Sequence, residues 1–165
     1  MALITRDSGS EVQSLRQAME QWLGGRGIPC AVIAYEHTDT AIAARAGETD
    51  IIIVLGGDGT FVGVARKLAA DPRPILGVNL GRVGFLAEIA PDSWKGAFSR
   101  MLDIGVRLEN GMALGYTLLR DGSPIWSGLA VNDLVVSRGG PARLVSLALT
   151  VDGNRLARLR ADGLI

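Results

Sequence analysis

The sequence predicts an α/β fold: a Rossmann-like parallel sheet with flanking helices, followed by the first part of an all-β domain. Short apolar segments alternate with helical ones up to about residue 105. One of these segments, Ile51–Leu55, is apolar on both faces, as a strand buried in a parallel sheet would be. Beyond residue 105, helical periodicity gives way to strand-like segments separated by turn pairs. We therefore expect one domain at residues 1–105 and another at residues 106–165.

The composition excludes several classes of protein. With 48% hydrophobic residues and 17 basic against 17 acidic side chains, the chain is neither disordered nor a strongly basic nucleic-acid binder. No apolar run approaches the roughly 18 residues of a membrane-spanning helix, so we expect neither a nucleic-acid nor a membrane partner. One Cys and one His provide no disulfide framework and no zinc cluster, and the N-terminus does not resemble a signal peptide. We expect a cytoplasmic protein.

The first elements follow in the order strand, helix, strand, helix. Ala2–Ile4 is expected to be a strand, and Ser8–Glu11 forms the pattern of a capping box at the start of a helix that runs to about Leu23. Pro29–Tyr35 is a short apolar strand, and Asp39–Ala46 is Ala-rich and expected to be helical.

The middle of the chain continues this alternation. The strand Ile51–Leu55 is followed by a helix over Phe61–Ala70, and Ile75–Val78 forms another apolar strand. Pro91–Leu102 is expected to be a helix with Pro91 near its first turn, where proline is tolerated.

The second half of the chain carries two hairpin signals. Asp121-Gly122 and Asp152-Gly153 are turn pairs typical of two-residue hairpin loops. Leu144–Val151 alternates between apolar and polar residues, which predicts a strand with one apolar face.

A glycine-rich segment, Gly56-Gly57-Asp58-Gly59-Thr60, joins the buried strand to the next helix. Such turns present backbone N–H groups to phosphate, although this one matches neither the P-loop nor the dinucleotide fingerprint. An aspartate in an anion-binding turn repels phosphate unless it has a chemical task or binds a metal. Asp58 is therefore either a general base for a hydroxyl that attacks a phosphoryl group, or a cap of the following helix.

Four segments carry a resemblance to a known family. The GGDGT sequence at residues 56–60 resembles the signature shared by NAD kinases, diacylglycerol kinases and sphingosine-kinase-like enzymes. Three further segments resemble blocks of bacterial NAD kinases, in the same order. They are Asn79–Leu86, Ala130–Val136 and Arg160–Ile165.

This resemblance implies an enzyme that transfers the γ-phosphoryl group of ATP to the 2′-hydroxyl of the adenosine ribose of NAD, with a divalent cation such as Mg²⁺, to give NADP. It implies that residues 1–105 form the nucleotide-kinase domain and residues 106–165 an incomplete NAD-binding domain, in a homodimer or homotetramer. Asp58 would be the proton acceptor. The residues implied to bind the nucleotides are Gly57, Gly59, Thr60, Phe85, Asn132, Asp133, Arg143, Arg160 and Asp162.

Several of these residues also have a purely structural interpretation. Asn132 and Asp133 are adjacent, so both can face one ligand only at a strand end or an irregular turn. Arg160 and Asp162 are two positions apart and would share one face of a strand, which could equally be a solvated charged face. Phe85 is either a core residue or a ring lining the nucleotide pocket.

Two alternative functions stay open. The GGDGT segment also allows a lipid kinase of the diacylglycerol class, and the chain could be a non-catalytic nucleotide-binding module. The Ser/Thr/Gly-rich loop that the resemblance places after Ile165 is missing, and the sequence stops within an apolar segment. We therefore expect a truncated chain that is inactive or poorly soluble, because an open sheet exposes an unpaired edge.

Overall fold

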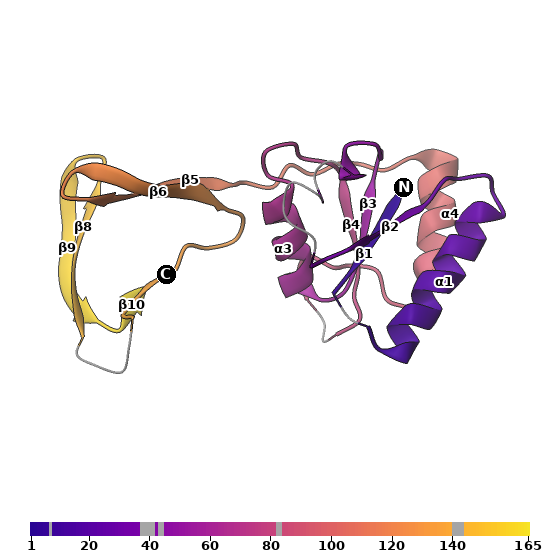
Figure 1. Cartoon of the computed structure of the whole chain (residues 1–165), viewed down its shortest axis with the longest axis horizontal. Helices are drawn as coiled ribbons and strands as arrows, with labels where there is room; N and C mark the ends of the chain where they lie inside the picture. Colours follow the sequence, from indigo (N-terminus) through magenta and orange to yellow (C-terminus); the bar gives the residue numbers. More distant parts are fainter. Residues whose placement is uncertain (7, 37–41, 43–44, 82–83, 140–143) are drawn as a thin grey trace. The chain divides into compact units, whose positions relative to one another are not determined.

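The structure is a computed structural model that describes residues 1–6, 8–36, 42, 45–81, 84–139 and 144–165. The chain divides into two units, Met1–Ala113 and Leu114–Ile165, and each is described by itself (Figure 1). In the described part of the chain, no helix is long and apolar enough to span a membrane.

Unit 1 is built on a four-stranded parallel sheet with the strand order β2-β1-β3-β4. The strands are β1 (Ala2–Thr5), β2 (Ala31–Ala34), β3 (Ile52–Leu55) and β4 (Ile75–Val78). All four residues of β3 are fully buried in the middle of the sheet. The prediction of a parallel sheet around a strand that is apolar on both faces is therefore confirmed.

Three described helices cover the two faces of this sheet: α1 (Ser10–Gly24), α3 (Asp58–Lys67) and α4 (Trp94–Ile104). Figure 1 shows α3 on one side and α1 and α4 on the other. Alternate residues of each strand enter separate cores. Ile52 and Val54 pack with residues of α3, and Ile53 and Leu55 pack with residues of α1 and α4.

The starts of the helices differ from the sequence predictions. The prediction of a capping box at Ser8–Glu11 is wrong, because Gly9 is the N-cap of α1. The carbonyl of Gly9 accepts the first helical hydrogen bond from Gln13 N–H at 3.0 Å. Helix α4 begins at Trp94, and Pro91 lies in the turn before it. The helix expected over residues 39–46 lies largely outside the described residues.

Helix α3 begins earlier than its apolar pattern suggests. The carbonyl of Gly57 accepts hydrogen bonds from the N–H groups of Thr60 and Phe61, at 3.0 and 3.1 Å. Asp58 is therefore the first residue of the helix and lies beside the carboxyl end of β3.

Unit 2 consists of antiparallel pairs. The hairpins are β5 (Leu114–Arg120) with β6 (Ser123–Ala130), and β8 (Val145–Val151) with β9 (Asn154–Ala161). A third pair joins β7 (Val136–Ser137) to β10 (Gly163–Leu164).

Both predicted hairpin turns are confirmed. The φ angles are +50° and +77° at Asp121 and Gly122, and +49° and +78° at Asp152 and Gly153, as in type I′ turns. Large apolar side chains remain exposed on these hairpins, including Trp126 at 66%.

Candidate functional site

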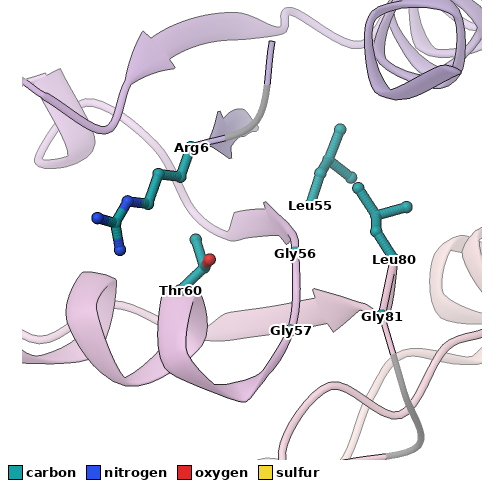
Figure 2. Close-up of a pocket in the computed structure, with 7 residues that line it drawn as sticks. All are labelled: Arg6, Leu55, Gly56, Gly57, Thr60, Leu80 and Gly81. Atoms are coloured by element: carbon teal, nitrogen blue, oxygen red, sulfur yellow. The ribbon is translucent and has the colours of Figure 1, made fainter. Parts of the chain in front are cut away.

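A cavity of about 370 Å³ lies at the carboxyl edge of the parallel sheet. Its described lining consists of Arg6, Leu55, Gly56, Gly57, Thr60, Leu80 and Gly81 (Figure 2). These residues come from the end of β3 and from the segments that follow β1, β3 and β4. Open α/β sheets bind their ligands at this edge, so the position of the cavity suits a substrate site.

The turn between β3 and α3 forms one wall of the cavity. It is tied to the neighbouring strand by Gly56 N–H, which donates to the carbonyl of Val78 at 3.0 Å, and by Leu80 N–H, which donates to the carbonyl of Gly56 at 3.4 Å. The turn leads directly into α3, whose first N–H groups have no partner within the helix. This wall therefore presents hydrogen-bond donors, which favours an anionic ligand.

The Asp58 carboxylate is fixed by three backbone amides of a distant segment. Phe85 N–H donates to Oδ2 at 2.8 Å, and the N–H groups of Leu86 and Ala87 donate to Oδ1 at 3.1 and 3.2 Å. Among the described residues, no side chain caps α3, and its N-cap is Gly57. The interpretation of Asp58 as a helix cap is therefore wrong, because its oxygens bond to the segment after β4 instead.

These hydrogen bonds also favour the charged form of the carboxyl group. The N–H groups of Phe85 and Ala87, with a smaller contribution from Leu86, lower the pKa of the Asp58 carboxyl below its ordinary value, while burial opposes them. Asp58 is therefore ionised at neutral pH, as a proton acceptor must be.

Gly84 makes this arrangement possible by leaving space for the carboxylate. A Cβ atom at position 84 would lie 2.6 Å from Asp58 Cγ and 2.7 Å from Oδ2, well inside normal contact. Only glycine lets the segment after β4 approach Asp58 this closely. Sequence reasoning missed this role, because no local pattern shows which side chain lies over the glycine.

Phe85 contributes its backbone and not its ring to this cluster. The side chain is 96% exposed, so the interpretation of Phe85 as a core residue is wrong. The proposal that its ring lines a nucleotide pocket stays a prediction.

The remaining predicted binding residues lie in unit 2. Asn132 and Asp133 are exposed and follow β6 in a segment without regular structure. Such a segment is one of the two settings in which adjacent side chains can face the same ligand. Arg160 is exposed near the end of β9. Arg143 lies outside the described residues.

Asp162 does not share a strand face with Arg160. It occupies a bend between β9 and β10, because the chain turns there to pair with β7. Its Oδ1 atom lies 3.1 Å from Nη1 of Arg138, and the backbone N–H of Arg138 donates to the Asp162 carbonyl at 3.0 Å.

The structure thus gathers Gly57 and Thr60 around the cavity, next in sequence to Asp58 and the exposed Gly59. Arg6 joins them, although sequence reasoning did not select it. Its position directly after the first strand could have indicated it, because the ends of parallel strands meet at one edge. Within the described part of the chain, no group of three acidic, His or Cys side chains could hold a metal ion.

The fold and this site define a class. A parallel sheet with helices on both faces, a glycine turn and a cavity at its carboxyl edge is typical of a nucleotide-binding α/β protein. The sequence matches the ATP-NAD kinase N-terminal domain over residues 5–106. The chain therefore belongs to the NAD kinase family.

Relatives from bacteria agree with this assignment. The NAD kinase of Nitratidesulfovibrio vulgaris strain Miyazaki F is 43% identical over 99% of this chain and 58% of its own length. The NAD kinase of Oleidesulfovibrio alaskensis is 42% identical over 99% of this chain and 56% of its own length. The chain thus spans little more than half of these curated relatives.

A solved structure shows the same fold. The crystal structure of yeast NADH kinase complexed with NADH matches 98% of this chain and 55% of its own, with a TM-score of 0.78 and 21% identity. At this identity the likeness concerns the fold alone, and it agrees with the predicted parallel sheet followed by antiparallel strands.

Proposed function

We propose that the protein is an NAD kinase, which transfers the γ-phosphoryl group of ATP to the 2′-hydroxyl of the adenosine ribose of NAD and produces NADP. Membership of the family supports this activity. The observation that carries the proposal is the position of the Asp58 carboxylate, which three backbone amides hold at the carboxyl edge of the sheet.

In the proposed reaction, the ribose hydroxyl oxygen attacks the γ-phosphorus and forms a new P–O bond. The bond from the γ-phosphorus to the bridging oxygen breaks, ADP leaves, and the hydroxyl proton passes to Asp58. A secondary alcohol is a very weak acid, so a carboxylate with a lowered pKa accepts this proton only as the new bond forms.

The hydrogen bonds of Asp58 leave a place for that hydroxyl. A carboxylate offers about four acceptor positions. Bonds within the described residues take two positions on Oδ1 and one on Oδ2. We assign the remaining position on Oδ2 to the ribose hydroxyl.

As the family resemblance implies, residues 1–105 would act as the nucleotide-kinase domain and residues 106–165 as part of the NAD-binding domain. Gly57, Gly59, Thr60 and Phe85 would contact the nucleotides from the kinase domain, and Asn132, Asp133, Arg143, Arg160 and Asp162 would contact NAD. The planar fork of Arg160 suits a phosphate or ribose, and Asp162 can accept a hydrogen bond from a carboxamide.

Further features of the proposal follow from the family resemblance. ATP would bring Mg²⁺ with it, since phosphate oxygens and water supply most ligands of this ion. The complete protein would act as a homodimer or homotetramer in the cytoplasm.

The test is product analysis with the complete encoded protein. Incubation with NAD, ATP and Mg²⁺ should yield NADP and ADP in equal amounts, and phosphorus NMR should place the new phosphate on the 2′ position. Phosphorylation of a diacylglycerol with NAD untouched would contradict the proposal and favour a lipid kinase. Tight NAD binding without any NADP would favour a non-catalytic module.

A further inference from the structure

Arg6 is the one charged side chain among the described residues that line the edge cavity. It follows β1 directly, and Figure 2 shows its side chain extending from the end of that strand toward α3, on the same side as Thr60. The described lining includes no carboxylate, and the oxygens of Asp58 bond to residues 85–87 instead. The cavity therefore carries positive charge.

The guanidinium group of Arg6 is supported by an aromatic ring. Its Cζ atom lies 5.4 Å from the ring centroid of Tyr35, which follows β2. Lys67 Nζ, at the end of α3, lies 5.3 Å from the same ring. A cation over a tyrosine ring is favourable, so Tyr35 limits the positions that the Arg6 side chain adopts.

The other polar groups around the cavity are also suited to an anion. The Gly56-Gly57 backbone and the Thr60 hydroxyl line it together with Arg6. A volume of about 370 Å³ is within the range of small-molecule sites and leaves room for several linked phosphates. A guanidinium offers five donors in a planar fork, which binds phosphate oxygens two at a time.

We propose that Arg6 binds the phosphate chain of the phosphoryl donor in this cavity and so determines the affinity for the donor. This inference rests on the proposed kinase activity. The chemistry recognised is a linked polyphosphate, from a nucleoside triphosphate or an inorganic polyphosphate. Arg6 holds the donor while Asp58 faces the acceptor hydroxyl, so the two substrates are served by different side chains.

The variants Arg6→Gln and Arg6→Lys test this assignment in the complete encoded protein. Arg26→Gln is the matched control, because Arg26 is also exposed and also lies over an aromatic ring, 3.6 Å from the centroid of Trp22, but outside the cavity lining. Loss of a charge-assisted hydrogen bond should raise the KM for ATP about tenfold or more in Arg6→Gln. The KM for NAD should change by less than about twofold, since a structural role alone would affect both substrates.

The charge-preserving Arg6→Lys variant should lie between the wild type and Arg6→Gln, since lysine keeps the charge and loses the fork. An unchanged KM for ATP in Arg6→Gln, in a preparation whose wild type produces NADP, would overturn the inference and leave the proposed function intact.

Calorimetry with ATP and with inorganic tripolyphosphate, in the absence of NAD, separates the inference from the proposed function. Both ligands should bind about tenfold more weakly to Arg6→Gln than to the wild type. If only ATP shows this dependence, the ligand is a nucleotide; if both do, the phosphate chain suffices. Arg6-dependent binding without any NADP formation would overturn the kinase proposal and support this site. Equal binding of these ligands to the wild type and to Arg6→Gln would overturn the site.

Discussion

Gly84 lies against the carboxylate of Asp58 so closely that any side chain at position 84 would overlap it. The three residues after Gly84 donate their backbone N–H groups to the same carboxylate, at 2.8 to 3.2 Å. The segment after β4 and the first residue of α3 are therefore closely joined, and Gly84 leaves the space that the Asp58 carboxylate occupies.

The first prediction concerns this close fit. Gly84→Ala should displace the carboxylate and cost about 1–3 kcal/mol in the free energy of unfolding, as overpacking does. Urea denaturation measures the change. Gly96→Ala in α4 is the matched control, because a Cβ there meets no atom within 4 Å. It should stabilise the protein by about 0.5–1 kcal/mol. Equal effects of the two substitutions would contradict the close contact.

The second prediction concerns pH. The folded-state pKa of Asp58 lies below its ordinary value of 3.8, so its hydrogen bonds contribute stability that is present above pH 3.8 and is lost as the pH falls through the folded pKa. An asparagine side chain has one carbonyl oxygen. If that oxygen accepts from Leu86 and Ala87, the Phe85 N–H group loses its acceptor, so Asp58→Asn should be less stable than the wild type at pH 7. The difference in urea midpoint should shrink below pH 4. A difference that stays constant down to pH 2 would contradict the lowered pKa.

The third prediction compares two phenylalanines with opposite surroundings. Phe98 is fully buried and makes edge contacts with Trp94 and Trp22, at centroid distances of 5.4 and 6.1 Å. Phe98→Ala should lower the free energy of unfolding by about 3–5 kcal/mol. Phe85→Ala, at a site that is 96% exposed, should change it by less than about 0.5 kcal/mol. If Phe85→Ala raises the KM for NAD with this stability unchanged, its ring contacts the dinucleotide.

The fourth prediction concerns the ion pair of Arg138 with Asp162. Arg138→Gln should leave Asp162 less well positioned and raise the KM for NAD by up to about fivefold, because a partly exposed pair contributes at most about 1 kcal/mol. The kcat should be unchanged. Arg107→Gln breaks a more exposed pair with Glu109 and should change neither constant. A loss of kcat in Arg138→Gln without a change in KM would contradict the positioning role.

Much of the fold is predictable because local patterns determine it. A strand that is buried on both faces must be apolar throughout, and this identifies β3 within one residue at each end. A type I′ hairpin requires positive φ at both turn residues, and Asp-Gly tolerates this at Asp121-Gly122 and Asp152-Gly153.

The site is only partly predictable, because its contacts join distant residues. The glycine segment and Asp58 stand out in the sequence, but the partners of Asp58 lie 27 to 29 positions further on. Their role depends on backbone N–H groups, which every residue except proline carries, so no residue type marks them. Arg6 was missed for a similar reason, since it reaches the cavity through the order of the strands in the sheet.

The role of Asp58 is tested most directly by the turnover of Asp58→Asn in the complete encoded protein, with NAD binding measured on the same preparation. If Asp58 accepts the ribose proton, kcat should fall by about 10²–10⁴-fold, while the dissociation constant for NAD stays within about threefold of the wild-type value. Undiminished production of NADP by this variant would contradict the assignment of Asp58 as proton acceptor.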